Sequence, residues 1–191
     1  PLLCVSVNRA DSDPHRQSAP QLALNDAAIV AGPPFRMIRM TLGIDGHAGP
    51  SISGDGMIVC TPAGSTAYNV SAGGPILAPD LRAFCITPIA AHTLAFRPVV
   101  FAGTSYLTLT MDRTNEPDPV SGDGLTVCAP GTDGTTLMLD GRAAAKLHVG
   151  DSIRIEFHDK PVRFVKNPHV GYWETLSTKM GWGASPRLRG S

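Results

Sequence analysis

The chain has 191 residues, 42% of them hydrophobic, and its 16 basic residues balance 16 acidic ones. This length and apolar content suffice to bury the core of one domain. The charge balance argues against nucleic acid and anionic membranes as partners, because phosphate backbones are contacted by basic surfaces. No apolar run reaches the roughly 18 residues of a membrane-spanning helix, so we expect a soluble, cytoplasmic protein.

Glycine and proline interrupt the chain throughout, with 20 and 17 copies, and leave apolar runs of about 4–8 residues between turn signals. This pattern predicts a mainly β fold. So many short strands favour two packed sheets in a β-sandwich-like arrangement, because wide open sheets usually curl or split. In chain order, the predicted strands are residues 2–7, 27–31, 36–44, 57–61, 84–89, 97–102, 105–111, 124–128, 135–139, 152–157 and 161–166.

Two segments predict short helices. Residues 65–72 follow a turn and begin with Ser65, a residue type that is favoured as an N-cap. Residues 171–180 place apolar side chains four positions apart, on one helical face. We expect a polar loop over 113–123 and a frayed tail over 184–191.

The spacing of cysteine and histidine gives no sign of a metal site. Neither residue type occurs in a C-x-x-C, H-x-x-x-H or H-E-x-x-H pattern, so we expect no protein-ligated metal. Each cysteine lies in or beside a short apolar run, and we expect these side chains to act as small hydrophobic residues. The cysteines are Cys4, Cys60, Cys85 and Cys128.

The stretch SGDGMIVCTPAGSTAYNVSAGGP, residues 53–75, carries the strongest functional pattern. Asp55 stands between two glycines where a tight turn enters a strand, so its carboxylate is placed to accept hydrogen bonds from sugar hydroxyls or an amide. Residues 65–67 are predicted to expose backbone N–H groups at a helix start, where a phosphate can bind. Tyr68 and Ser71 would share a helical face. By spacing alone, the stretch fits either a nucleotide site or an Asx turn followed by a capped helix.

Together with five other stretches, this block resembles the C-terminal domain of the NAD kinase family, in the order that the family shows. The resemblance predicts that residues 1–183 form one β-rich, NAD-binding domain. The other stretches are ALNDAAI at 23–29, ITPIAAHTLAFRPVVF at 86–101, LDGR at 139–142, VGDSIRI at 149–155 and YWETLSTKMGWG at 172–183.

The resemblance implies a phosphotransferase that phosphorylates the adenosine 2′-hydroxyl of NAD with ATP, accompanied by a divalent metal such as Mg²⁺, to give NADP. It implies that an N-terminal α/β domain with a Gly-Gly-Asp-Gly motif carries the catalytic base. We therefore expect no catalytic residue in this chain, and no activity from it alone. The implied partners are NAD, ATP, the N-terminal domain and further copies in a dimer or tetramer. In that assembly Asp55 is expected to reach the NAD site of a neighbouring subunit.

Several residues match ligand positions of the family. Asn25 and Asp26 match a pair that contacts the ribose hydroxyls and the adenine end, and an amide beside a carboxylate can hold a vicinal diol. Arg36 stands where the family often has a basic contact. The nucleotide-binding run of the family is matched by Thr66, Ala67, Tyr68, Asn69, Val70 and Ser71.

Three further ligand positions depart from the family pattern. Ser53 stands where a basic side chain is frequent. Ala90, followed by another alanine, replaces a bulkier residue and a proline. Arg142 replaces the glutamine of the family's Asp-Gly-Gln motif, which substitutes a charged fork for an amide.

Two other interpretations stay open. A non-catalytic nucleotide-binding or assembly domain would keep the same β fold, and the residues that distinguish it from a kinase lie outside this sequence. A lipid kinase of the diacylglycerol or sphingosine type would share the two-domain plan. It would need an apolar acyl pocket in place of the GSTAY block, and the presence of that block argues against it.

Overall fold

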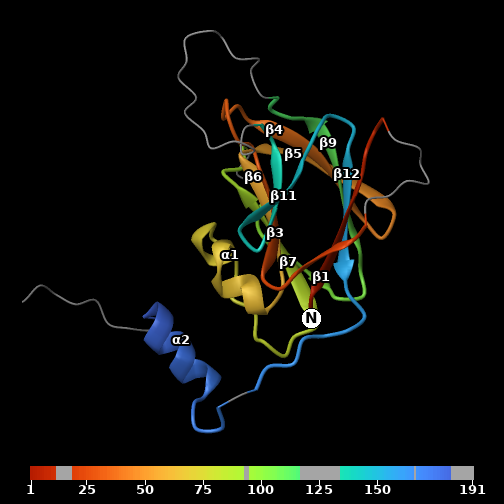
Figure 1. Cartoon of the computed structure of the whole chain (residues 1–191). Coiled ribbons are helices and arrows are strands. Elements are labelled where there is room, and N and C mark those ends of the chain that lie inside the picture. Colours follow the sequence, from red (N-terminus) through yellow and green to blue (C-terminus); the bar gives the residue numbers. More distant parts are fainter. Residues whose placement is uncertain (12–18, 93–94, 117–133, 166, 182–191) are drawn as a thin grey trace, which may run out of the picture. The chain divides into compact units, whose positions relative to one another are not determined.

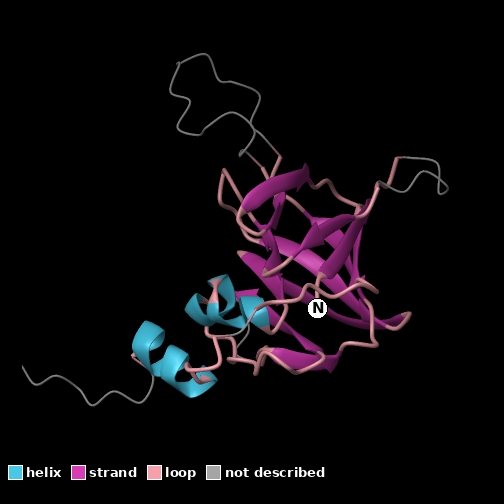
Figure 2. Ribbon diagram, turned by 60° about the horizontal axis from the view of Figure 1, so that its bottom comes forward, coloured by secondary structure: helices cyan, strands magenta, loops and turns pink. Residues whose placement is uncertain are grey.

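The computed structural model describes residues 1–11, 19–92, 95–116, 134–165 and 167–181. Within the first of two units, Pro1–Pro161, strands dominate and the helical segments are short (Figure 2). The strands form two six-stranded sheets (Figure 1), and every recorded pairing is antiparallel. The prediction of a mainly β, two-sheet fold is confirmed.

The first sheet, called sheet A here, has the strand order β2-β1-β12-β9-β4-β5. Its strands β1, β9 and β12 alternate buried and partly exposed residues, as expected when one face of a sheet covers a core. The strands span Gln21–Ala23 (β2), Leu3–Asn8 (β1), Ser152–Phe157 (β12), Leu107–Arg113 (β9), Ile38–Ile44 (β4) and His47–Gly54 (β5).

The second sheet, sheet B, has the order β11-β10-β3-β6-β7-β8. Its central strands β3 and β6 are buried along nearly their whole length, so both faces of this sheet are covered. The strands span Arg142–Lys146 (β11), Thr136–Leu139 (β10), Asp26–Val30 (β3), Gly56–Cys60 (β6), Ala83–Ile89 (β7) and Val99–Ala102 (β8).

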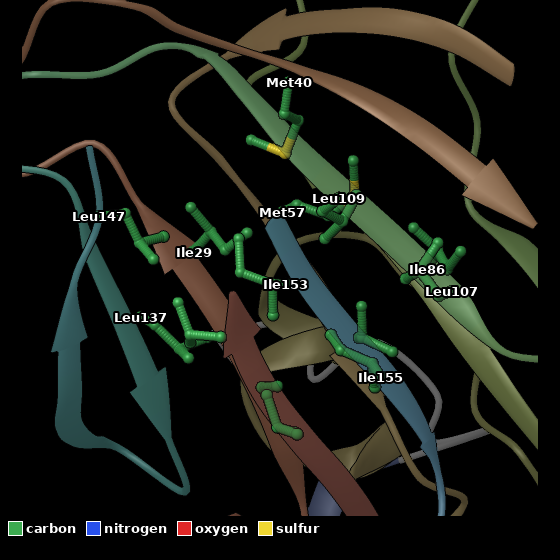
Figure 3. Close-up of a cluster of buried hydrophobic side chains, with 14 of the residues drawn as sticks. Ile29, Met40, Met57, Ile86, Leu107, Leu109, Leu137, Leu147, Ile153 and Ile155 are labelled. Carbon is green, nitrogen blue, oxygen red and sulfur yellow. The ribbon is translucent and has the colours of Figure 1, made fainter. Parts of the chain in front are cut away.

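The main core lies between the two sheets. Figure 3 shows side chains from strands of both sheets meeting there, among them Ile29 and Met57 from sheet B and Leu109 and Ile153 from sheet A. A smaller apolar cluster lies on the other face of sheet B, where Leu77 packs with residues of β3, β6 and β7. The segment between β6 and β7 therefore covers the outer face of sheet B.

That covering segment is helical, but not as predicted. A 3₁₀ turn, η1, spans Ala63–Thr66, and helix α1 spans Tyr68–Ser71, with Ala67 between them outside helical geometry. Ser65 is not an N-cap: it is buried inside η1, and its hydroxyl donates to the Pro62 carbonyl at 2.7 Å.

The expectation of free backbone N–H groups over residues 65–67 is also wrong for Ser65 and Ala67. The N–H of Ser65 donates to the Pro62 carbonyl at 3.3 Å, and that of Ala67 donates to the Gly64 carbonyl at 2.9 Å. The Thr-Pro corner already turns the chain into η1, so the helical geometry begins earlier than the serine and uses these donors.

Most predicted strands are confirmed within one to two residues, and three strands were missed. These are β2, β5 and β11. Strand β2 is very short, β5 contains glycine and proline, and β11 is alanine-rich, so none has the β-branched run that marks a strand. The predicted strand at 124–128 lies outside the described residues. So does most of the predicted loop, whose first residue, Arg113, ends β9.

The second unit begins at Val162, and helix α2 spans Tyr172–Met180 within it, which confirms that prediction. Gly181 ends the helix in the left-handed conformation, at φ 62°. The predicted strand at 161–166 is wrong, because residues 161–165 form no strand. That run has strand-forming side chains, but Val165 is fully exposed and the described residues offer it no strand to pair with.

Candidate functional site

One end of sheet B gathers most of the polar residues that the sequence singles out. Asp26 begins β3 and pairs with Cys60, the last residue of β6. Residues 61–71 continue from that point. The turn at Asp140, between β10 and β11, lies beside the same start of β3, because the N–H of Asp140 donates to the Asp26 carbonyl at 3.0 Å. We call this end of sheet B the site end.

Asp26 presents a buried carboxylate at the site end. The residue is only 5% exposed, and among the described residues no hydrogen bond to its carboxylate is found. Burial raises the pKa of the Asp26 carboxyl above its usual value, and the nearby carboxylate of Asp140 raises it further. A mostly buried carboxylate with open acceptor positions is suited to bind a hydroxyl or N–H donor.

Asn25 is held against the turn that follows β6. The buried Thr61 donates its hydroxyl to the Leu24 carbonyl at 2.7 Å and accepts from the Gly64 N–H at 3.1 Å. A Cβ atom at Gly64 would lie 1.9 Å from the Asn25 carbonyl oxygen, so only glycine allows the two backbones to approach this closely.

Helix α1 turns one side into the protein and the other outward. Asn69 is fully buried, and its amide donates to the carbonyls of Ser65 at 3.1 Å and Pro75 at 3.0 Å. Its side-chain oxygen accepts from the Thr87 hydroxyl at 2.6 Å. Asn69 therefore fixes the helix from inside, whereas Tyr68 is 44% exposed and stays open to a ligand.

The site end holds the larger group of residues predicted from sequence. Thr66, Tyr68, Ser71 and Arg142 are exposed there, and Asn25, Ala67 and Val70 are half-buried. This arrangement agrees with the expected shared face of Tyr68 and Ser71. The full group is Asn25, Asp26, Thr66, Ala67, Tyr68, Asn69, Val70, Ser71 and Arg142.

Asp55 lies at the opposite end of sheet B. It is the single residue between β5 of sheet A and β6 of sheet B, and it is exposed, as predicted. Its N–H donates to the Ile89 carbonyl at 3.0 Å, and its carbonyl accepts from the Ala31 N–H at 2.9 Å. Strand β3 separates the two ends by about 14 Å, at roughly 3.4 Å per residue. The Asp55 side chain therefore does not reach the site end of its own chain.

Three other predicted residues lie with Asp55. Ser53 accepts a hydrogen bond from the Arg39 side chain at 3.2 Å, and Ala90 follows the end of β7 with φ 45°. The backbone of Arg36 is held by Asn115, whose amide donates to the Arg36 carbonyl at 2.7 Å, while the Arg36 residue is exposed. The chain thus presents two separate groups rather than one.

Sequence reasoning missed the residues that support the candidate ligand residues without being predicted ligands themselves. Thr61, Asp140 and Asn115 each hold backbone of a segment that carries predicted ligand residues. An Asp-Gly pair is typical of a tight turn, so the pair at 140–141 is a signal from which this turn could have been predicted. Nothing local to that pair shows that the turn lies beside residues more than a hundred positions earlier.

Cys60 and Cys85 lie opposite each other on β6 and β7, and both are fully buried, which confirms them as small core residues. Cys4 is half-buried, and Cys128 lies outside the described residues.

In the described part of the chain, no three His, Cys, Asp or Glu residues lie close enough together to hold a metal ion. None of the described helices is long and apolar enough to cross a membrane.

Comparison with solved structures gives the class of this β sandwich. It superposes on yeast NADH kinase complexed with NADH with a TM-score of 0.77, at 24% identity, over 99% of this chain and 51% of that one. It also matches an NAD kinase from Archaeoglobus fulgidus in complex with ATP, with a TM-score of 0.62 at 28% identity, over 87% of this chain and 54% of that one. The fold is that of a domain found in pyridine nucleotide kinases.

Sequence comparison identifies the family. The model of the ATP-NAD kinase C-terminal domain matches residues 24–128, more than half of the chain. The NAD kinase of Rhodopirellula baltica is 39% identical over 173 residues, which cover 90% of this chain and 50% of that protein. That of Syntrophotalea carbinolica is 37% identical over 160 residues, 84% of this chain and 50% of that protein. The chain belongs to the NAD kinase family, and it spans about half the length of these curated relatives.

Proposed function

We propose that this chain is the NAD-binding part of an NAD kinase, which transfers the γ-phosphate of ATP to the adenosine 2′-hydroxyl of NAD and forms NADP. The buried Asp26 carboxylate carries the proposal. It lies at the start of β3 without a hydrogen-bond donor from the described residues, and it follows the half-buried Asn25 directly. The exposed Tyr68 lies on α1, which contacts β6. Membership of the family supports the same reading.

The site end offers complementary groups to an adenosine. Asp26 accepts hydrogen bonds from ribose hydroxyls, and Asn25 both donates and accepts. The exposed Tyr68 ring provides an apolar face for the base. Thr66 at the end of η1 and Ser71 at the end of α1 add exposed hydroxyls. Ala67 and Val70 shape this surface, while Asn69 fixes it from inside.

The contribution of this chain to the reaction is orientation. Phosphoryl transfer asks the protein mainly to position the reactants and to stabilise charge. Contacts to the ribose from Asn25 and Asp26 would fix the direction of its 2′-oxygen. We assign the catalytic base to the part of the protein that the relatives have beyond this chain, so the chain alone is expected to be inactive.

The divalent metal that accompanies ATP neutralises charge on the phosphates. The described residues do not fit a protein site for it, since no suitable group of three His, Cys, Asp or Glu residues lies together. We therefore assign none of the described residues to the metal. NAD and ATP are the proposed substrates, and the cytoplasm is the proposed location.

The group around Asp55 points to an assembly. Asp55 lies about 14 Å of strand away from Asp26, so its side chain does not reach a ribose bound at Asp26. We assign Asp55, with Ser53, Ala90 and Arg36, to the NAD site of a neighbouring copy in a dimer or tetramer. A single copy would then hold NAD through the site end alone.

Calorimetric titration of this chain with NAD tests the proposal. We expect a dissociation constant between micromolar and millimolar. Tyr68→Ala should weaken it about tenfold or more, because it removes the exposed ring at the site end. Val149→Ala shortens an apolar side chain that is 57% exposed between β11 and β12, and it should leave binding unchanged. A folded sample that takes up no NAD would contradict the proposed function.

A further inference from the structure

The backbone of residues 24–26, which carries the Asn25-Asp26 pair, is held by the side chain of one distant residue. The carboxylate of Asp140 accepts hydrogen bonds from three consecutive backbone N–H groups: Leu24 at 2.8 Å, Asn25 at 2.6 Å and Asp26 at 3.2 Å. In return, the N–H of Asp140 donates to the Asp26 carbonyl at 3.0 Å. Four hydrogen bonds thus join one turn to the start of β3.

The remaining backbone groups of this segment are bound to Thr61. Its hydroxyl donates to the Leu24 carbonyl at 2.7 Å, and its N–H donates to the Asn25 carbonyl at 2.9 Å. Every backbone N–H and carbonyl of residues 24–26 therefore has a protein partner. A segment outside regular pairing that is satisfied this completely has one defined conformation.

A carboxylate suits this task better than an amide does. Three donors converge on Asp140, and a carboxylate has two accepting oxygens, whereas an amide has one. The turn also restricts which residue can stand there. Asp140 has φ 48° and Gly141 has φ 77°, so residue 140 is in the left-handed region, which Asp, Asn and Gly enter most readily.

We propose that Asp140 is a positioning residue for the nucleotide site: by holding three backbone N–H groups, it aims the side chains of Asn25 and Asp26 at the ribose without touching the ligand itself. This inference rests on the proposed function. The role is distinct from that of Arg142, which follows in the same hairpin and whose exposed side chain is free to face a ligand directly.

The same carboxylate has an electrostatic effect on the site. Its charge adds to burial in raising the pKa of Asp26. The other titratable group facing Asp26 is the buried thiol of Cys60, opposite it on β6. Removing the charge at residue 140 should therefore lower the pKa of Asp26, a change that loss of a purely structural contact elsewhere would not produce.

The test compares Asp140→Asn with a matched control, Asp45→Asn. Asp45 and Gly46 form the same kind of turn between β4 and β5, with φ 50° and 80°, and the Asp45 carboxylate accepts the Tyr106 N–H at 2.9 Å. That turn belongs to sheet A. Asparagine tolerates the left-handed conformation, so both variants keep their turns and lose only a carboxylate.

For Asp140→Asn we expect NAD to bind about tenfold to a hundredfold more weakly. The Asn25 and Asp26 side chains would be displaced, and displaced side chains lose most of their contribution to binding. Amide hydrogen exchange should become faster at Leu24, Asn25 and Asp26, and carboxyl NMR should report a lower pKa for Asp26. Asp45→Asn should match the wild type in all three measurements. If Asp140→Asn does not fold, Asp140→Gly removes the carboxylate and keeps the turn.

Each outcome decides a separate question. If the wild-type chain does not bind NAD, the proposed function fails, and the positioning role fails with it. If the wild type binds and Asp140→Asn binds equally well, only the positioning role is overturned. Faster amide exchange in Asp140→Asn with unchanged NAD affinity would also overturn the positioning role, because Asp140 would then support the fold but not the site.

Discussion

Substituting Asp26 by asparagine should make the protein more stable and at the same time a poorer NAD binder. The residue is 5% exposed, and its pKa is raised first by burial and then by the carboxylate of Asp140. Both causes disfavour the charged form. Wherever the pH lies above this raised pKa, the native protein therefore carries an ionised group that it would hold more easily as the neutral acid.

The sign of the pH dependence follows from this raised pKa. Between the ordinary value of 3.8 and the higher native value, the folded protein binds more protons than the unfolded chain. Stability contributed by this group therefore falls as the pH rises through that window, and the penalty is complete above the native pKa. Asp26→Asn removes an ionisable group, so the variant should gain in melting temperature at pH 7 and lose that advantage near pH 3.

The cost of the same substitution lies in binding. A hydrogen bond to a charged group contributes about 1.5–3 kcal/mol, so Asp26→Asn should weaken NAD binding about tenfold to 150-fold. Calorimetric titration and thermal unfolding at pH 7 and pH 3 measure both effects on one sample. Asp112→Asn, which alters an exposed carboxylate on sheet A, is the control. An Asp26→Asn variant that is less stable at pH 7 and binds NAD normally would refute the reasoning.

Three further predictions concern the support of the site. Gly64→Ala should destabilise the fold by about 1–3 kcal/mol in denaturant unfolding and abolish NAD binding, because its Cβ would meet the Asn25 carbonyl oxygen at 1.9 Å. Asn69→Ala should cost about 1–3 kcal/mol, measured the same way, because it leaves the buried Thr87 hydroxyl without its acceptor. Asp55→Asn should leave NAD binding by a monomeric chain unchanged, yet raise the KM for NAD more than that for ATP in the assembled full-length enzyme. Equal KM values for NAD would count against the neighbouring-site assignment.

The sequence was informative wherever local composition decided the structure. Runs of β-branched and apolar residues between glycines and prolines predicted the central strands, such as β3 and β6, because these strands are buried on both faces. The edge strands β5 and β11 were missed, since an edge strand is formed by its pairing rather than by its own preference. Residues 161–165 show the converse: strand-forming residues without a pairing partner among the described residues form no strand.

The candidate ligand residues were predicted from the sequence, but the contacts that hold them in place were not. The exposed Tyr68, the half-buried Asn25 and the buried Asp26 follow from motifs and their resemblance to the family. Their supporting contacts did not follow. Asn69 belongs to the same motif, but its buried bonds to Thr87 depend on how sheet B packs against α1. Asp140 contacts residues 114 to 116 positions earlier, and no local pattern encodes that contact.

The arrangement around Asp26 explains how the fold tolerates an unfavourable group. A buried carboxylate beside a second carboxylate opposes folding, and a side chain free to move would turn away from both. Here the backbone on either side of Asp26 is fixed, by Asp140 through the N–H groups and by Thr61 through the preceding carbonyls. The favourable hydrogen bonds therefore come from the main chain, and the side chain keeps its unmet acceptor capacity. A ribose that supplies hydroxyl donors to Asp26 would offset this unfavourable free energy on binding. The Asp26 charge that lowers the stability of the unliganded protein would thus increase its affinity for the ligand.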